Sequence, residues 1–304
     1  MTALNTFPPA VQTELVLAAN DFKAGLHAKV ISRMAPVCAV YPQCGLAHKL
    51  HGSALDLLGQ SAEAVAALRA AVSLLPEDAQ AWSNLGNALQ HAHEWAAALQ
   101  AHQQAITLQP GQAVFRYNLG CCYLEQGDKL AALEQFWRAY ELDPADGELA
   151  QLCRVLVLEV GDPQLQQAFC RLNLRHQPDD HGAQAMLGAL LLNAREGDLT
   201  EAEHLLRAAL AADPSQATVW SNLAILLERQ HRMFEALQAG EHAVAADPEW
   251  AMGHNNLGVT LRAMAQWADA RACFERALTL DPECADAWYN LGCVCIDLGD
   301  HEMA

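Results

Sequence analysis

Five asparagines stand at related places in the sequence: Asn84, Asn118, Asn222, Asn256 and Asn290. Neighbouring members of this row are 34 residues apart, except between Asn118 and Asn222, where Leu152 and Met186 occupy the corresponding places. A carboxamide offers two N–H donors and a carbonyl acceptor. A row of carboxamides can therefore pair with the N–H and C=O groups of an extended peptide without reading its side chains.

Other residues capable of chemistry give weaker signals. His48 and His51 are one helical turn apart, and His91 and His93 lie beside Glu94, but no third metal ligand of fixed geometry can be named for either group. The sequence has no phosphate-binding glycine loop, no nucleophile elbow and no zinc-protease motif. We therefore expect no catalytic residue, no metal site and no cofactor.

The ten cysteines include no Cys-x-x-Cys pair. Cys121 and Cys122 are adjacent, and Cys293 and Cys295 are two residues apart, so on a helix their side chains diverge and form neither a bridge nor a chelate. Small apolar side chains in a reducing cytosol are the favoured interpretation, and metal binding is the alternative.

Composition excludes several function classes. The formal net charge is −18, from 18 Lys and Arg against 36 Asp and Glu, and such a surface repels phosphate backbones. We therefore expect no nucleic-acid partner, and no basic stripe of the kind used by RNA-reading helical arrays is found. The start of the chain lacks a basic segment followed by an apolar run, and no apolar stretch is long enough for a membrane span. These features favour a cytoplasmic protein without a membrane partner.

The spacing of the prolines indicates the structural elements that position the asparagines. Eight prolines are spaced by 34 residues with one interval of 36: Pro42, Pro76, Pro110, Pro144, Pro178, Pro214, Pro248 and Pro282. Such a period predicts stacked supersecondary units that cannot bury a core alone. After a lead of residues 1–10, the predicted repeats are 11–44, 45–78, 79–112, 113–146, 147–180, 181–216, 217–250, 251–284 and a partial 285–304.

Small residues recur inside each repeat. The eighth position is Gly or Ala in most repeats, for example Gly52, Gly86 and Gly120, and the twentieth and twenty-seventh positions are mostly Ala. Together with apolar residues three or four places apart, this pattern predicts two closely packed helices in each repeat. Glycines mark the turn between the two helices, at Gly59, Gly127, Gly161, Gly197 and Gly299.

The order of Trp, Leu, Gly, Ala, Ala and Pro at these offsets resembles the tetratricopeptide repeat, over residues 11–304. The resemblance implies an all-α fold, a right-handed α-solenoid superhelix of helix-turn-helix hairpins whose first helices line a concave groove. It implies that the sixth residue of each repeat, the place of the asparagine row, points into this groove. It implies nothing about catalysis.

The asparagine row is similar to the asparagine ladder in the repeat region of O-linked N-acetylglucosamine transferases. By this resemblance Asn84, Asn118, Asn222, Asn256 and Asn290 are peptide-binding residues; the alternative is that repeat duplication copied them without a shared ligand. The leading hypothesis is a non-catalytic scaffold that binds an extended polypeptide in the groove. The second is the substrate-selecting arm of a larger glycosyltransferase with its catalytic region beyond residue 304. A carboxylate clamp is not expected, because Val114 stands where a cation is required.

Departures from the pattern carry expectations of their own. Pro36 should kink or shorten the second helix of repeat 11–44. Repeat 147–180 is degenerate, because Arg154, Gln166 and Asn173 replace small residues, although Asp162 and Pro163 still read as the start of a helix. Repeat 181–216 holds a two-residue insertion. The partial repeat 285–304 suggests a longer parent protein, or an open end that meets a partner or another copy.

Overall fold

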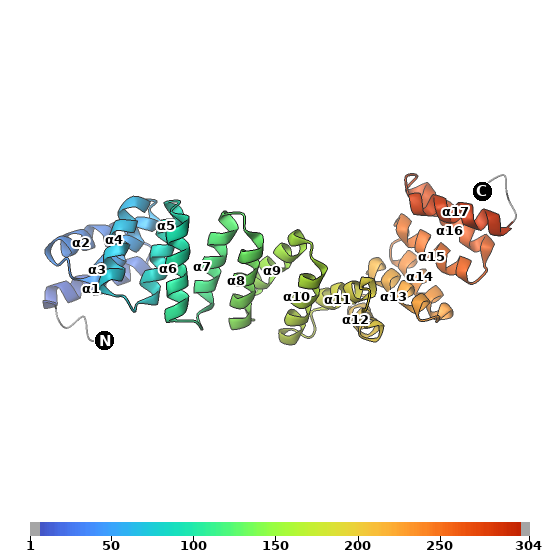
Figure 1. Cartoon of the computed structure of the whole chain (residues 1–304), viewed down its shortest axis with the longest axis horizontal. Helices are drawn as coiled ribbons and strands as arrows, with labels where there is room; N and C mark the ends of the chain where they lie inside the picture. Colours follow the sequence, from blue (N-terminus) through green and yellow to red (C-terminus); the bar gives the residue numbers. More distant parts are fainter. Residues whose placement is uncertain (1–6, 299–304) are drawn as a thin grey trace. The chain divides into compact units, whose positions relative to one another are not determined.

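The computed structural model describes residues 7–298 of the 304-residue chain. In this range it contains seventeen α-helices and no strand, so the protein has an all-α repeat fold (Figure 1). No helix in the same range has both the length and the apolar character that crossing a bilayer requires.

The helices alternate between first and second helices of the repeats. The first helices are α1 (Pro9–Lys23), α3 (Gly45–Leu57), α5 (Ala79–His91), α7 (Ala113–Glu125), α9 (Gly147–Val160), α11 (His181–Asn193), α13 (Ala217–Arg229), α15 (Ala251–Ala263) and α17 (Ala285–Leu298). The second helices are α2 (His27–Val40), α4 (Ser61–Leu74), α6 (Trp95–Leu108), α8 (Lys129–Leu142), α10 (Pro163–His176), α12 (Leu199–Ala212), α14 (Met233–Ala246) and α16 (Trp267–Leu280).

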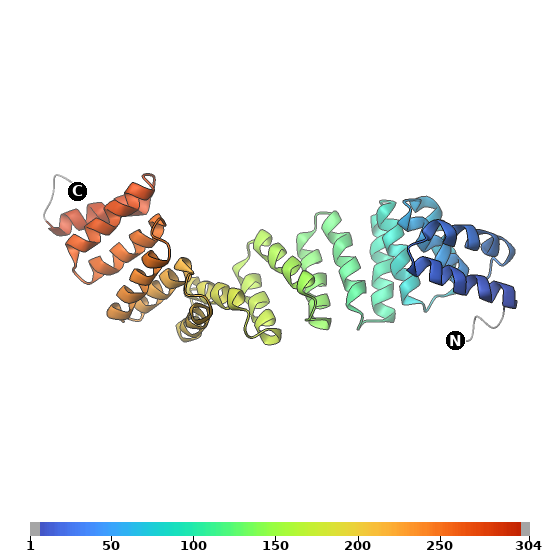
Figure 2. The ribbon, with the colours of Figure 1, turned by 180° about the vertical axis from the view of Figure 1, so that it is seen from behind.

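Contacts divide the chain into two compact units, Met1–Val160 and Gly161–Ala304. We call them the N-terminal unit and the C-terminal unit. Second helices pack between the first helix of their own repeat and the first helix of the next, as α4 does between α3 and α5 in the N-terminal unit and α14 does between α13 and α15 in the C-terminal unit (Figures 1 and 2). First helices also contact one another directly, α3 with α5 and α5 with α7 in the N-terminal unit, and α13 with α15 in the C-terminal unit.

Glycine at the eighth position allows the two helices of a hairpin to approach closely. A Cβ atom added to Gly52 would lie 2.6 Å from Leu68 Cγ, and one added to Gly120 would lie 2.6 Å from Phe136 Cε1. Real Cβ atoms do not come this close to their neighbours. The glycine therefore makes room for the large side chain at the twenty-fourth position of the same repeat, which is fully buried in both cases.

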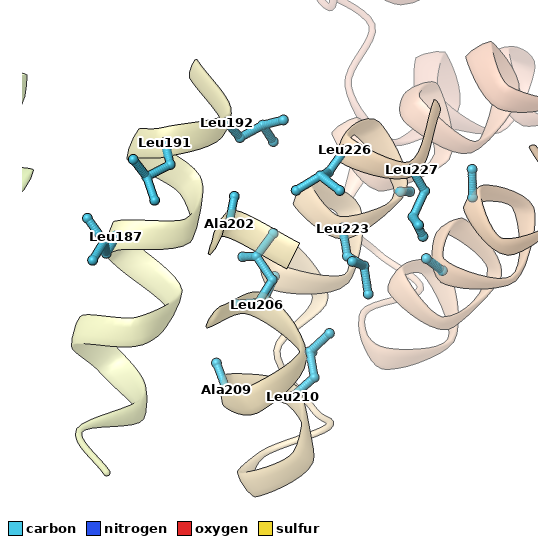
Figure 3. Packing of buried hydrophobic residues seen from close by; sticks show 14 of the residues in the cluster. Leu187, Leu191, Leu192, Ala202, Leu206, Ala209, Leu210, Leu223, Leu226 and Leu227 are labelled. Atoms are coloured by element: carbon cyan, nitrogen blue, oxygen red, sulfur yellow. The ribbon is translucent and has the colours of Figure 1, made fainter. Parts of the chain in front are cut away.

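The alanines at the twentieth and twenty-seventh positions confirm the predicted close packing. All twelve are completely buried: Ala64, Ala71, Ala98, Ala105, Ala132, Ala139, Ala202, Ala209, Ala236, Ala243, Ala270 and Ala277. Leucines complete the core between them, and Figure 3 shows Leu187 and Leu191 of α11, Leu206 of α12 and Leu223 of α13 in one such cluster. Because each alanine is small, the helix that carries it can pack with its neighbour through backbone and methyl groups.

The start of α10 agrees with the sequence. Asp162 is its N-cap and accepts a hydrogen bond from the backbone N–H of Gln164, and Pro163 is the first helical residue. Later in α10, Asn173 takes a place that is Ala in other repeats. Its buried carboxamide is satisfied by donating to Asp180 Oδ2 at 2.6 Å.

Two helix ends differ from the shortened helix at Pro36 and the lead of residues 1–10 that the sequence suggested. Pro36 does not shorten α2, which runs for 14 residues to Val40, as long as α4. Pro36 removes a partner from the carbonyl of Ser32, but both residues are exposed, so water can satisfy that carbonyl. In addition, α1 begins at Pro9, inside the expected extended lead, because proline is favoured at the first position of a helix.

Successive repeats are joined by a hydrogen bond at the fourth position. Trp82 Nε1 donates to the carbonyl of Pro76 at 2.9 Å, and Trp220 Nε1 donates to that of Pro214 at 2.9 Å. The proline ends one repeat and the tryptophan lies in the first helix of the next. The recurring tryptophans are therefore structural links between repeats, in addition to their packing role.

Candidate functional site

All five asparagines of the row lie on first helices and are half-buried: Asn84 on α5, Asn118 on α7, Asn222 on α13, Asn256 on α15 and Asn290 on α17. The first two belong to the N-terminal unit and the other three to the C-terminal unit. A half-buried side chain is both held by its neighbours and open to solvent, which is the setting that a ligand-binding group needs.

The amide nitrogen of four asparagines donates to a side chain on the preceding first helix. In the N-terminal unit, Asn84 Nδ2 lies 2.7 Å from Ser53 Oγ and Asn118 Nδ2 lies 3.0 Å from Ser83 Oγ. These are hydrogen bonds donated by a side-chain amide to the neighbouring repeat, and we call them, and their counterparts below, inter-repeat amide bonds.

The C-terminal unit repeats the arrangement. Asn256 Nδ2 lies 2.8 Å from Ser221 Oγ, and Asn290 Nδ2 lies 3.0 Å from Asn255 Oδ1. The accepting side chains of both units are buried, with exposed fractions between 0% for Ser83 and 8% for Ser53. A buried hydroxyl without a partner would destabilise the fold, so each bond satisfies a group that water reaches poorly.

The side-chain carbonyl oxygens of the row differ in whether they already accept a hydrogen bond. Asn84 Oδ1 accepts from Gln80 Nε2 at 2.8 Å, and Asn256 Oδ1 accepts from Asn255 Nδ2 at 3.3 Å. Among residues 7–298 no donor reaches the Oδ1 atoms of Asn118 and Asn290. Each of these two oxygens can accept a hydrogen bond, and its orientation is fixed because the Nδ2 atom of the same carboxamide makes an inter-repeat amide bond.

Asn222 is the exception in the row. Its side chain makes no hydrogen bond to any part of the chain that the structure describes. The corresponding place on the preceding first helix is Ala185, which has no acceptor to offer. The carboxamide of Asn222 therefore keeps both its donors and its acceptor for solvent or a ligand.

A pocket of about 300 Å³ surrounds Asn84, between α3 and α5. Leu50 and Gln80 are among the residues that line it, together with Lys49, whose ammonium group lies 2.6 Å from Asp78 Oδ2. The ammonium group of Lys49 is thus already paired with a carboxylate of the same chain. The pocket is lined by carboxamides and apolar side chains, together with the carboxylate of Asp56, which is paired with His91.

Sequence reasoning missed the acceptors of the inter-repeat amide bonds. A signal was present, because a small polar residue directly precedes the asparagine in three repeats, at Ser83, Ser221 and Asn255. The pairing joins this residue to the asparagine of the following repeat, 35 positions later. A motif search inside a single repeat therefore does not reveal it.

The histidines noted in the sequence have other contacts. His48 Nε2 lies 3.0 Å from the carbonyl of Pro42, and His91 Nδ1 lies 2.8 Å from Asp56 Oδ1. In the described part of the chain no three His, Cys, Asp or Glu residues are grouped so that they could hold a metal ion.

All ten cysteines are free. Burial, with a smaller contribution from Cys44, raises the pKa of the Cys38 thiol to about 11, and burial raises the pKa of Cys153 to about 12. A thiol with a raised pKa is protonated at neutral pH and is a poor nucleophile and metal ligand. These two cysteines act as apolar packing groups.

Comparison with known proteins identifies the repeat. A family model described as tetratricopeptide repeat matches residues 49–113, 187–249 and 255–304, more than half of the chain, and a second model with the same description matches residues 113–146. No curated protein matches the sequence.

Several solved structures are similar to the chain. One is the crystal structure of the APC/C hetero-tetramer Cut9–Hcn1, with a TM-score of 0.47 and 15% identity, where the match covers 97% of this chain and 57% of that one. Another is YrrB, a TPR protein with an unusual peptide-binding site, with a TM-score of 0.42 and 22% identity over 61% of this chain and 95% of that one. The MamA RS-1 ArsTM double mutant has a TM-score of 0.48 and 22% identity over 57% of this chain and 96% of that one.

Proposed function

Because the chain belongs to the tetratricopeptide repeat family, we propose that it is a non-catalytic scaffold whose first helices bind an extended polypeptide through the asparagine row. The observation that carries this proposal is the fixed orientation of the carboxamides. Four of the five are held by an inter-repeat amide bond, at distances of 2.7 to 3.0 Å. A group that is already oriented loses little entropy when it binds, so each contact adds more to affinity.

The geometry also indicates what the row would bind. With its amide nitrogen engaged, Asn118 or Asn290 presents a carbonyl oxygen, which accepts a hydrogen bond from a peptide N–H. Asn222 can both donate and accept. An extended polypeptide offers such backbone groups whatever its sequence, and binding of this kind is sequence-tolerant.

Asn222 gives the sharpest test, because its side chain supports no other hydrogen bond among residues 7–298. We expect Asn222→Ala to leave the unfolding temperature unchanged and to weaken binding of a fluorescent random-sequence pool of peptides of about 12 residues. The loss should be about fivefold, as for one hydrogen bond. Fluorescence anisotropy measures the binding, and thermal unfolding followed by circular dichroism measures the stability.

The matched control is Gln103→Ala, which removes an exposed carboxamide from α6, a second helix. It should leave peptide binding unchanged. The variant Asn222→Ala/Asn256→Ala/Asn290→Ala, if still helical, should lose peptide binding altogether. Equal binding by the wild type and both Asn222 variants would mean that the row is inherited repeat consensus without a ligand.

The second candidate function is the substrate-selecting arm of a larger glycosyltransferase resembling the O-linked N-acetylglucosamine transferases. The asparagine row is the observation that favours it. The test is the reading frame that follows the codon for Ala304: a nucleotide-sugar-binding domain there supports this candidate, and a stop codon or an unrelated domain contradicts it.

Two further parts of the proposal concern partners and location. On α17, Trp288 and Tyr289 are 56% and 73% exposed, and we propose that this helix allows self-association. A molar mass that stays monomeric over a wide concentration range, measured by light scattering, would contradict it.

We also propose a cytoplasmic location, which cell fractionation tests.

A further inference from the structure

A second and larger pocket lies between α7 and α9 in the N-terminal unit. Its volume is about 580 Å³, and it is lined by apolar side chains and by carboxylates. The apolar residues are Val114, Tyr117, Leu149 and Leu152. The carboxylates are those of Asp143, Asp146 and Glu148, and we call the whole the acidic pocket.

The pocket opens where the asparagine row is interrupted. Leu152 of α9 takes the place of the asparagine and cannot donate a hydrogen bond to α7. The first helices α3, α5 and α7 contact one another in turn, but α7 and α9 do not make a contact of the same extent. The missing inter-repeat amide bond thus coincides with a wider separation of the two helices and with the larger pocket.

The three carboxylates are not neutralised by the fold. None of them forms an ion pair with a Lys, Arg or His in residues 7–298. Asp146 uses one oxygen, which accepts the backbone N–H of Leu149 at 3.0 Å as the cap of α9, and its other oxygen is available. Asp143 and Glu148 are exposed.

This concentration of charge is particular to one junction between repeats. The places of Asp143, Asp146 and Glu148 are taken by Leu75, Asp78 and Gln80 at the start of α5, and by Asp247, Trp250 and Met252 at the start of α15. The acidic pocket is therefore not a property of the repeat as such. It is also no metal centre, since no group of three ligands in the described residues is arranged around one point.

Tyr117 forms the aromatic part of the lining. Its side chain is 41% exposed, and that of Val114 is 49% exposed, so both present apolar surface to an occupant. Cys121, burial, and the carboxylates of Asp146 and Glu148 raise the pKa of Tyr117. The ring thus lies in the negative field of the carboxylates, and an aromatic ring beside a cation gains a further attraction.

We propose that the acidic pocket receives a lysine or arginine side chain of the polypeptide bound along the first helices. The aliphatic part of such a side chain packs against Val114, Tyr117 and Leu152, and its cation lies among the carboxylates of Asp143, Asp146 and Glu148. Long basic side chains combine an apolar stem and a charged end in this way. The inference rests on the proposed function, and it adds a preference for basic residues to a row that reads only the backbone.

The test uses defined peptides of about 12 residues, made of Ser, Ala and Thr with a single central Lys, norleucine or Glu. Norleucine keeps the stem of lysine and lacks its charge. We expect the Lys peptide to bind about fivefold more tightly than the norleucine peptide at low ionic strength, and the Glu peptide to bind least. Added salt should reduce the advantage of the Lys peptide.

The variant Asp143→Asn/Asp146→Asn/Glu148→Gln keeps the shape of the pocket and removes its charge, and asparagine can still cap α9. It should bind the Lys and norleucine peptides equally. The control is Glu241→Gln/Asp269→Asn/Glu283→Gln, which changes three exposed carboxylates of the C-terminal unit and leaves the pocket intact. This control should keep the preference for lysine.

The outcomes separate this inference from the proposed function. If all three peptides bind the wild type equally, polypeptide binding stands and the acidic pocket has no part in selection. If the preference for lysine disappears equally in both triple variants, it arises from net charge, and the pocket is again excluded. If no peptide binds the wild type, the proposed function fails and the inference fails with it.

Discussion

His102 occupies, in the hairpin of α5 and α6, the place that Phe136 and Phe274 occupy in two other hairpins. Its side chain is completely buried, and neither ring nitrogen has a hydrogen-bond partner in the described structure. A Cβ atom on Gly86 would lie only 2.5 Å from His102 Cε1, so the imidazole fills the space that the glycine leaves. A polar ring here carries the cost of two unsatisfied nitrogens.

We expect this cost to appear as a dependence of stability on pH. Burial lowers the pKa of His102 to about 4, whereas an unfolded histidine titrates near 6.5. As the pH falls from about 6.5 to about 4, the unfolded chain binds a proton that the native state refuses, so the free energy of unfolding decreases. This decrease in the free energy of unfolding reaches about 3 kcal/mol below about pH 4, and it is absent above about pH 7.

His102→Phe should remove this dependence and stabilise the protein at neutral pH by about 1 to 3 kcal/mol, because both unsatisfied nitrogens are lost. Urea unfolding of the wild type and the variant at several pH values measures both effects. His204→Gln, which changes an exposed histidine, is the control. An equal decrease in stability with acid for wild type and His102→Phe would show that other groups are responsible.

At the scale of the elements, the turn between the two helices has a left-handed residue in every described hairpin except that of α11 and α12. Gly25, Gly59, Gly127 and Gly161 are such residues, with φ between 72° and 81°. Three turns use other residues, namely His93, His231 and Ala265, with φ between 58° and 61°. A residue with a Cβ atom is strained in this conformation by about 1 to 2 kcal/mol.

Ala265→Gly should therefore increase the free energy of unfolding by about 1 kcal/mol, after the greater flexibility of glycine in the unfolded chain is allowed for. The reciprocal change, Gly59→Ala, should decrease it by a similar amount, since no atom lies within 4 Å of the added Cβ and only the backbone conformation is at stake. Chemical unfolding measures both. Two changes of the same sign would contradict this account of the turn.

The sequence predicted the elements better than the contacts between them. A period of 34 residues and small residues at fixed places were sufficient for the helical hairpins, because helix formation and packing inside a hairpin depend on residues close in the chain. The insertion in repeat 181–216 lengthens a turn, residues 194–198, that has three residues, such as 58–60, in most other described repeats. The bond between Asn118 and Ser83 depended instead on the register of two repeats, which no pattern inside one repeat contains.

The same limit explains the rest of the candidate site. The asparagine row was visible as a pattern, and the structure adds that Asn222 differs from the others because Ala185 offers no acceptor. The acidic pocket could not be foreseen, because Tyr117, Asp143 and Leu152 come from three different helices or turns. Only their packing brings them to one cavity.

At the scale of the whole molecule, the helices that contact each other within each unit belong, among residues 7–298, to one repeat or to neighbouring repeats. In such an array stability is approximately a sum of local terms, so a defect should remain local. Gly120→Ala places a Cβ atom 2.6 Å from Phe136 Cε1 and should destabilise its hairpin by about 1 to 3 kcal/mol. We expect faster amide hydrogen exchange in α7 and α8 and unchanged exchange in α15 and α16.

Mass spectrometry of peptic fragments measures this exchange. Gly111→Ala is the control, since an added Cβ atom there has no neighbour within 4 Å. Faster exchange along the entire chain would show that the two compact units unfold as one cooperative body.

The inter-repeat amide bonds have a consequence for how such a chain can change in evolution. A repeat such as 251–284 carries the acceptor Asn255 for the repeat after it and the donor Asn256 for the repeat before it, on adjacent residues. A gene duplication or deletion of whole repeats therefore keeps both halves of the bond together. A repeat duplicated from one of this kind can donate to the repeat before it and accept from the repeat after it. Asn222 itself, opposite Ala185, marks a junction in the described part of the C-terminal unit at which the two halves do not match.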